Sequence, residues 1–278
     1  MAKMSGSNTY KWYKGNSTEL TYKGNCWLRN MKLRYEAKAT DPIVQEIAAS
    51  RNINPKYETL NIEFKDNITT IIMTRPAKKN AFNVEMYKEM ILALDAAAKD
   101  KSVLSVLTGS GDYFSSGNDL TNRARLLNRE EEKSHFLILR TLIDRFIAFP
   151  KPLIAVINGP AIGIAVTILG LFDLVYATDR ATEMLVFNKM VTAREACDLG
   201  LVTEVFPDKT FKQEVWAKLK AYALLPKDTL TLSKQLIRGM NKEKLHATCK
   251  REFDLFSENA SSEESYVRLR FFQKKAKL

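Results

Sequence analysis

The chain has 278 residues, of which 45% are apolar and 27% are charged. These fractions are those of a folded globular protein, so the collagen-like, coiled-coil and wholly disordered classes are excluded. The cysteines Cys26, Cys197 and Cys249 and the histidines His135 and His246 are too scattered to form the close pairs of a zinc site or a disulfide framework. We therefore expect no metal site, and a reducing compartment.

The net charge of +11 is concentrated at the N-terminal end, where residues 1–40 hold eight Lys and Arg against Glu19 and Glu36. Aromatic residues alternate with these charges, a pattern that could bind nucleic acid. A solvated extension explains the pattern as well, and we favour it because no folded nucleic-acid-binding motif accompanies the charges. We expect residues 1–56 to be a basic, poorly ordered extension and residues 57–278 to form the folded domain.

Strand and helix patterns alternate along the first half of this domain. Branched and apolar runs with turn residues between them predict a hairpin, and apolar residues at three- and four-residue spacing predict helices. The expected elements are a strand at 57–64, a strand at 68–74, a helix at 84–100, a strand at 103–107 and a long helix at 129–149.

Residues 153–172 form a charge-free run long enough to cross a bilayer. Asn158-Gly159-Pro160 interrupts the run with turn chemistry, since proline lacks an N–H donor and disfavours helix in the residue before it. We therefore expect a buried strand at 153–157 and a buried helix at 161–171, and no membrane span.

The remaining chain continues the alternation less regularly. Thr192 and Glu195 have the spacing of a capping box, which predicts the start of a helix. We expect a strand at 174–177, a helical piece from 182, the capped helix, a strand at 201–206, and helices at 211–225 and 228–256, the last interrupted near Gly239. This alternation indicates an α/β fold.

Four segments resemble the crotonase superfamily of enoyl-CoA hydratases and isomerases, and within it the peroxisomal type of Δ3,Δ2-enoyl-CoA isomerase. They are Arg75-Pro76 with Asn80-Ala81, SSGNDL at 115–120, KPLIAVINGPAIG at 151–163 and LVTEV at 201–205. The resemblance implies a crotonase-like spiral of ββα units with a C-terminal helical region. It also implies a homotrimer, an acyl-CoA or enoyl-CoA thioester as ligand, and no cofactor beyond the CoA of the substrate.

The resemblance places an oxyanion hole at the backbone N–H groups of Asn118 and Ile164. Two such donors stabilise the enolate oxygen that forms when a thioester loses its α-proton, and losing one donor costs ~10²–10³ in rate. The residues implied to contact substrate are Ser115, Ser116, Gly117, Asn118, Asp119 and Ala81. Lys78 and Lys79 could meet the CoA phosphates or simply be solvated.

The glutamates that the family uses as bases are missing. The hydratase position corresponds to Thr167, so hydratase activity is not expected. Isomerases carry their glutamate in a proline–glutamate–glycine turn on the next strand-plus-helix unit, but here Asp179-Arg180-Ala181 runs directly into Thr182. We expect one such unit, about 30 residues long, to be missing near residue 181.

Asp119, Asp179 and Glu183 are the nearest substitutes, and we expect none of them to act as the base. The leading hypothesis is a Δ3,Δ2-enoyl-CoA isomerase family protein of fatty-acid β-oxidation, which shifts a 3-enoyl-CoA double bond to trans-2-enoyl-CoA, with impaired activity. The alternative is a catalytically silent acyl-CoA-binding or protein-interaction protein. Contact with nucleic acid through residues 1–40 is the third, less favoured hypothesis.

The tripeptide Ala276-Lys277-Leu278 is similar to the Ser-Lys-Leu peroxisomal address. It predicts a peroxisomal location and an import receptor as partner. The mitochondrion and the cytoplasm are the alternatives.

Overall fold

The computed structural model describes residues 57–119, 129–184 and 190–260. These residues belong to one compact unit, Ile47–Leu278. The expected basic extension at 1–56 and the tripeptide Ala276-Lys277-Leu278 lie outside the described residues.

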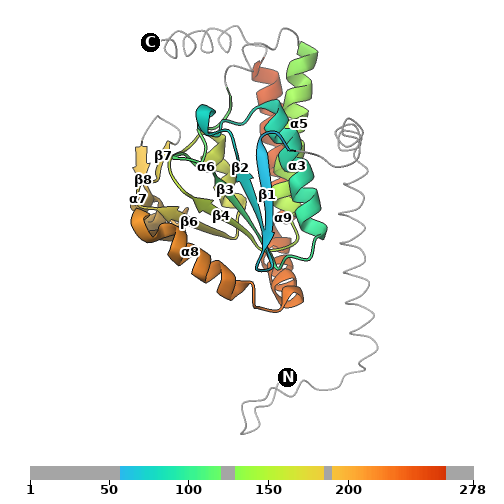
Figure 1. Ribbon diagram of the computed structural model, residues 1–278. Coiled ribbons are helices and arrows are strands. Elements are labelled where there is room, and N and C mark those ends of the chain that lie inside the picture. The colour runs from blue at the N-terminus through green and yellow to red at the C-terminus, as the bar shows by residue number, and fades with distance from the viewer. Residues whose placement is uncertain (1–56, 120–128, 185–189, 261–278) are drawn as a thin grey trace, which may run out of the picture. The chain divides into compact units, whose positions relative to one another are not determined.

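A six-stranded sheet with the order β1-β2-β3-β4-β6-β9 forms the centre of this unit (Figure 1). The expected hairpin is confirmed: β1 and β2 are antiparallel, and Asp66 and Asn67 between them have φ of 52° and 58°, as a tight hairpin turn requires. All other neighbours in the sheet run parallel. The strands are β1 (Leu60–Lys65), β2 (Ile68–Met73), β3 (Leu104–Gly109), β4 (Leu153–Ile157), β6 (Leu174–Thr178) and β9 (Glu204–Phe206).

Helices connect and cover these strands. The helical segments are η1 (Pro76–Lys78), α3 (Val84–Lys99), α5 (Arg129–Ala148), α6 (Ile164–Thr167), η2 (Ile168–Leu171), α7 (Ala193–Asp198), α8 (Asp208–Tyr222) and α9 (Lys227–Ala260). Figure 1 shows α3, α5 and α9 side by side, and α8 lies against the sheet apart from them. No described helix is both long enough and apolar enough to cross a membrane.

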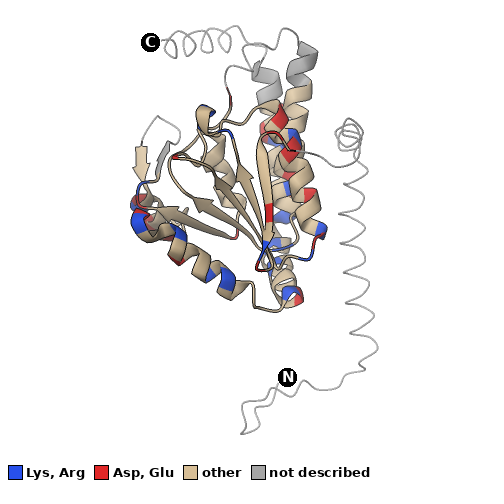
Figure 2. Cartoon of the chain, in the orientation of Figure 1, with Lys and Arg blue, Asp and Glu red and all other residues tan. Residues whose placement is uncertain are grey.

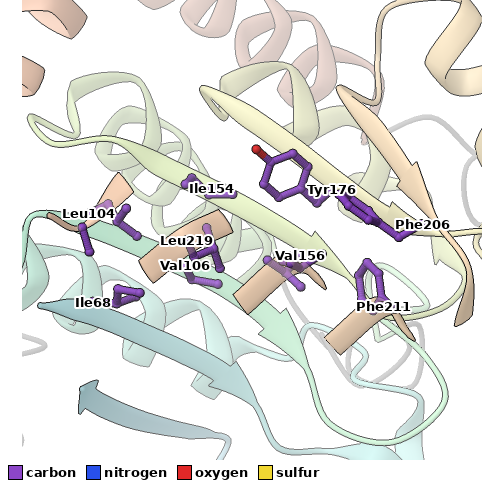
Figure 3. Packing of buried hydrophobic residues seen from close by; sticks show 11 residues of the cluster. Ile68, Leu104, Val106, Ile154, Val156, Tyr176, Phe206, Phe211 and Leu219 are labelled. Carbon is purple, nitrogen blue, oxygen red and sulfur yellow. The ribbon is translucent and has the colours of Figure 1, made fainter. Parts of the chain in front are cut away.

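A hydrophobic core lies between α8 and the sheet (Figure 3). Side chains two residues apart on a strand share a face, so Ile154 and Val156 of β4 both point at α8. Phe211, Val215 and Leu219 meet them at the four-residue spacing of one helix face. The inner strands β3, β4 and β6 carry no charged residue (Figure 2), as expected for parallel strands buried on both faces.

A second sheet takes up the first residues of one expected helix and the described residues of another expected helical piece. Its three strands have the order β5-β7-β8 and are β5 (Ala161–Ile162), β7 (Thr182–Met184) and β8 (Met190–Thr192). The helix expected at 161–171 therefore begins only at Ile164, because residues 161–162 pair with β7. The helical piece expected from residue 182 is likewise wrong for the described residues there, which form β7 and β8.

Two expectations about the later helices have different outcomes. The capping box is confirmed: the Glu195 N–H donates to the Thr192 hydroxyl (3.2 Å), and the Thr192 N–H donates to the Glu195 carboxylate (2.8 Å). The interruption near Gly239 is wrong, because α9 runs through it without a break.

Cations on the inner face of α9 fasten it to the sheet. The Lys234 ammonium, 8% exposed, lies 2.7 Å from both the Asp173 carboxylate and the Lys151 carbonyl oxygen. The Arg238 guanidinium reaches the same carboxylate (3.4 Å). Lys151 itself is buried and donates to Asp100 (2.6 Å). Lys234 and Arg238 thus join α9 to Asp173, just before β6, and Lys234 also joins it to Lys151, just before β4.

Candidate functional site

The candidate site is built on the turns that follow β3 and β4, at the carboxyl edge of the parallel strands. The Asn158 amide donates to the Gly111 carbonyl oxygen (2.8 Å), and its own oxygen accepts from the Gly109 N–H (3.1 Å). A Cβ atom on Gly159 would collide with the carbonyl group of Asp112. Glycine is needed there because the two turns meet at backbone distance. Open parallel sheets typically bind their ligands at this edge.

Asn80, in the loop after the hairpin, fastens a third segment to these turns. Its side chain accepts from the Arg75 N–H (3.0 Å) and donates to the carbonyl oxygens of Ser110 (2.9 Å) and Tyr113 (2.8 Å). Its backbone oxygen accepts from the Ser115 hydroxyl (2.8 Å). Asn80 is buried with a left-handed φ of 51°, a conformation that asparagine tolerates.

The peptide unit between Gly117 and Asn118 has a fixed direction. The Gly117 carbonyl oxygen accepts from the Phe82 N–H (2.8 Å), and the Phe82 carbonyl oxygen accepts from the Asp119 N–H (2.8 Å). In a trans peptide the N–H points opposite to the C=O, so the Asn118 N–H points away from Phe82. Within the described residues, no protein acceptor takes this N–H.

The Ile164 N–H also has no protein acceptor among the described residues, for a different reason. Ile164 is the first residue of α6, and the Gly163 carbonyl oxygen accepts from Val166 (2.9 Å) and Thr167 (3.2 Å). The Ile164 N–H therefore points out of the helix, where no intrahelical acceptor exists. No acceptor elsewhere in the described part of the chain bonds to it.

Gly117 brings the two turns into contact. Its φ is +82°, and a Cβ atom there would lie 2.5 Å from the Ile162 carbonyl oxygen and 3.7 Å from the Gly163 Cα. The Ile162 N–H also donates to the Ser115 carbonyl oxygen (3.0 Å). Asn118 and Ile164 thus each lie one residue beyond a contact between the two turns.

A salt bridge holds the first turn from behind. The Arg75 guanidinium lies 3.0 Å from the Asp119 carboxylate, whose side chain is only 8% exposed, and it also donates to the Ala81 carbonyl oxygen. The carboxylate of Asp119 is thus engaged in holding the turn, which leaves it poorly placed to replace a catalytic base.

The other proposed substrate contacts lie in the same region but differ in exposure. Ser115 is buried, and its hydroxyl accepts from the Gly117 N–H (3.1 Å), so this side chain holds the turn from inside. The Ser116 N–H donates to the Lys79 carbonyl oxygen (2.9 Å). The Lys79 ammonium is exposed and lies 4.9 Å from the centre of the Tyr113 ring, a cation–π contact at the edge of the site.

The candidate base positions hold no free carboxylate that the structure describes. The Thr167 hydroxyl donates to the Ile164 carbonyl oxygen (3.2 Å). Asp179 accepts from the Asp208 N–H (3.0 Å), at the start of α8. The backbone of Glu183 pairs with Ala161 across the second sheet, while its side chain lies outside the description.

Tyr87 is a residue of this region that the sequence did not reveal. It lies on the buried face of α3, and its hydroxyl donates to the side-chain oxygen of Asn118. Burial, and secondarily the charge of Asp119, raise the pKa of the Tyr87 hydroxyl well above its ordinary value. The sequence pattern could not single it out, because a tyrosine among Met86 and Met90 reads as ordinary core.

No cluster of three or more His, Cys, Asp or Glu side chains suited to a metal ion occurs in the part of the chain that the structure describes. The groups available at the site are therefore backbone N–H donors, the Arg75–Asp119 pair and the nearby lysines.

Comparisons with known proteins show what this chain is similar to. The family model described as enoyl-CoA hydratase/isomerase matches residues 63–182. Human enoyl-CoA delta isomerase 2 is 47% identical over 80% of this chain and 65% of its own length. Mouse enoyl-CoA delta isomerase 3, peroxisomal, is 45% identical over 77% of this chain and 78% of its own. The crystal structure of an enoyl-CoA hydratase/isomerase from Pseudoalteromonas atlantica superimposes with a TM-score of 0.71 at 27% identity, covering 78% of this chain and 98% of that one.

The lengths of these matches carry further information. The chain spans slightly less than two thirds of the human relative. That alignment runs over 256 positions, whereas 80% of 278 residues is about 222, so about 34 positions of the relative have no counterpart here. The family match also ends at residue 182, beside the discontinuity expected near residue 181.

Proposed function

The chain belongs to the enoyl-CoA hydratase/isomerase family, and from that premise we propose that it binds enoyl-CoA thioesters with the thioester oxygen between the N–H groups of Asn118 and Ile164. The observation that carries this proposal is the state of the two peptide units. Their carbonyl oxygens are both engaged within the fold, while their N–H groups point out of two touching turns.

The proposed reaction is the shift of a 3-enoyl-CoA double bond to trans-2-enoyl-CoA in fatty-acid β-oxidation. Removing the α-proton leaves an enolate whose negative charge resides on the thioester oxygen. Two fixed backbone donors stabilise that oxygen without reorganising, which is worth ~10²–10³ in rate for each donor. CoA phosphates would meet Lys78 and Lys79 at the edge of the site, and no cofactor other than the CoA of the substrate is needed.

We propose that turnover is slow because the proton-transferring glutamate of the family has no counterpart in this sequence. About 34 aligned positions of the human relative have no counterpart in this chain. This number matches the length of the strand-plus-helix unit that carries the glutamate in Δ3,Δ2-enoyl-CoA isomerases. Asp119 is paired with Arg75, and Asp179 is engaged at the start of α8. A positioned general base contributes ~10²–10⁴ in rate, so we expect a kcat lower than that of the human relative by this factor.

A catalytically silent acyl-CoA-binding or protein-interaction protein is the second candidate, and the missing base is the observation that favours it. Purified protein is mixed with a 3-enoyl-CoA, and the absorbance of the conjugated product is followed beside the human relative. Calorimetry with trans-2-enoyl-CoA measures binding separately. Weak turnover with binding supports an impaired isomerase, binding without turnover selects the silent binder, and absence of binding rejects both forms of the thioester proposal.

The assembly and the location are also proposals. We propose a homotrimer, as the family resemblance implies, which light scattering would test against the mass of 31.7 kDa for one chain. We propose the peroxisome as location and an import receptor as partner, supported by the name of the mouse relative and by Ala276-Lys277-Leu278. A reporter fused to the last dozen residues that stays in the cytosol would reject the peroxisomal location.

A further inference from the structure

The hydrogen bond from Tyr87 to Asn118 bears on how the Asn118 N–H is held. The Tyr87 side chain is fully buried on α3, so its hydroxyl needs a partner inside the protein. That partner is the side-chain oxygen of Asn118, which belongs to an otherwise exposed residue. A buried phenol thus reaches out of the core to one surface side chain.

The ring of Tyr87 also packs against Phe82, whose backbone bonds to the same turn. It stacks on Phe82 with ring centroids 5.6 Å apart and planes inclined by 14°. Phe82 is the residue whose N–H and C=O bond to Gly117 and Asp119, on either side of Asn118. One side chain therefore contacts both Phe82, whose backbone orients the Asn118 peptide, and the side chain of Asn118 itself.

The protonation of Tyr87 suits this role. Burial raises the pKa of its hydroxyl well above the ordinary value, and the negative charge of Asp119 raises it further. The phenol therefore keeps its proton at physiological pH and remains a donor to the Asn118 oxygen. Asparagine at 118 offers the acceptor that this donor needs, whereas the backbone N–H would be present with any residue except proline.

We propose that Tyr87 is a positioning residue for the thioester site, which acts through the Asn118 side chain to hold the Asn118 N–H in its ligand-facing direction. The inference rests on the proposed function for its ligand, but its structural part does not require one. Tyr87 touches no reacting atom, and its effect passes through one hydrogen bond and one ring contact.

The ligand-bound test uses 2,4-hexadienoyl-CoA, whose absorbance moves to longer wavelength when donors polarise its thioester carbonyl. We expect Tyr87→Phe to reduce this red shift and to weaken binding about 2- to 12-fold, the effect of one lost hydrogen bond. Asn118→Ala keeps the backbone N–H, removes the acceptor and should give the same loss. Tyr87→Phe added to Asn118→Ala should cause no further loss, because the bond is already gone.

Tyr176→Phe is the matched control. Tyr176 is equally buried and hydrogen-bonded, to the Tyr222 hydroxyl (3.2 Å), but it lies in the core under α8. It should lower stability without changing the red shift. A red shift in Tyr87→Phe equal to that of the unchanged protein would overturn the proposal. So would a double variant in which Tyr87→Phe weakens binding by its full factor although Asn118→Ala has already removed the acceptor.

A ligand-free measurement separates this inference from the proposed function. The backbone order parameter of the Asn118 amide should lie near ~0.85 in the unchanged protein and fall toward ~0.6 in Tyr87→Phe and in Asn118→Ala. Tyr176→Phe should leave it unchanged. If the protein binds no thioester, the proposed function fails while this measurement still decides the role of Tyr87. An order parameter at Asn118 that no variant moves rejects the positioning role. Asn118→Ala changes an exposed residue, so it remains informative if Tyr87→Phe fails to fold.

Discussion

Gly117→Ala is the substitution that should disturb the candidate site most directly. The new Cβ atom would lie 2.5 Å from the backbone oxygen of Ile162, which no rotation of a side chain can move away. The residue would also keep a φ of +82°, which alanine disfavours. Relief requires the turn after β3 to separate from the turn after β4.

Both costs can be put on one scale. The left-handed conformation costs an alanine ~1–2 kcal/mol, and forcing an atom into occupied space costs ~1–3 kcal/mol, so the free energy of unfolding should fall by about 2–5 kcal/mol. Gly200→Ala is the matched control, because Gly200 has a φ of +78° but no atom within 4 Å of the new Cβ. Only the conformational cost of ~1–2 kcal/mol applies to it.

Thermal unfolding of the two variants, side by side, checks this reasoning. One kcal/mol shifts the melting temperature of a domain of about 150–250 residues by about 2–4 °C, so Gly117→Ala should melt about 2–12 °C below Gly200→Ala. The Gly117 variant should also lose affinity for enoyl-CoA, while the Gly200 variant keeps it. Equal melting temperatures would refute the claim that the two turns meet at Gly117.

Three further substitutions, with Lys220→Met as a control, test the fold. Gly239→Ala, with open space around the new Cβ atom in the continuous helix α9, should raise the free energy of unfolding by ~1 kcal/mol, measured in urea; a loss would contradict the unbroken helix. Lys234→Met removes a buried ammonium from the Asp173 carboxylate, which keeps Arg238, and from the Lys151 carbonyl oxygen, and should cost ~1.5–3 kcal/mol. Breaking the exposed Lys220–Asp66 pair with Lys220→Met should cost at most ~1 kcal/mol. Equal effects would show that α9 is not anchored there. For Asp100, burial works to raise the pKa, but hydrogen bonds from Lys151, Ser102 and Thr69 outweigh it and hold the pKa below its ordinary value. A carboxyl whose pKa is lower in the folded than in the unfolded protein stabilises the fold at a pH above its unfolded pKa, and this contribution is lost as the pH falls through the folded pKa. The difference in the free energy of unfolding between the unchanged protein and Asp100→Asn should therefore shrink below about pH 4. A gap that stays constant from pH 7 to pH 3 would contradict this linkage.

Local patterns predicted the elements whose ends are set by neighbouring residues. The strand at 153–157 has the expected bounds, because a short branched run ended by Asn158-Gly159-Pro160 leaves little alternative. The capping box at Thr192 is likewise a contact between near neighbours. Residues close in sequence set the ends of such elements, so the sequence alone predicts those ends well.

The misassigned segments depend on distant partners. Residues 161–162 are apolar enough for a helix, yet they pair with β7, and β7 pairs in turn with β8. Nothing within residues 161–171 or 182–192 announces these pairings. Gly239 led to a wrong prediction because distant contacts outweigh its local effect. One exposed glycine destabilises a helix by only ~1 kcal/mol, and contacts such as the ion pair of Lys234 with Asp173 hold α9 in place.

The resemblance implied an oxyanion hole at Asn118 and Ile164, and that role stays a proposal. The structure shows why both N–H groups point away from protein acceptors in the part of the chain that it describes. The hydrogen bond from Tyr87 arises from a helix that precedes the turn by about thirty residues in sequence, and no local pattern encodes it.

We propose a site that can stabilise an enolate oxygen but holds, in the described part of the chain, no free carboxylate to take the α-proton. The most direct test is exchange of the α-protons of bound acyl-CoA in D₂O, followed by NMR beside the human relative. We predict that the thioester binds while its α-protons exchange ~10²–10⁴-fold more slowly than on the relative. Exchange as fast as on the relative would mean that a base is present after all, and the account would be wrong.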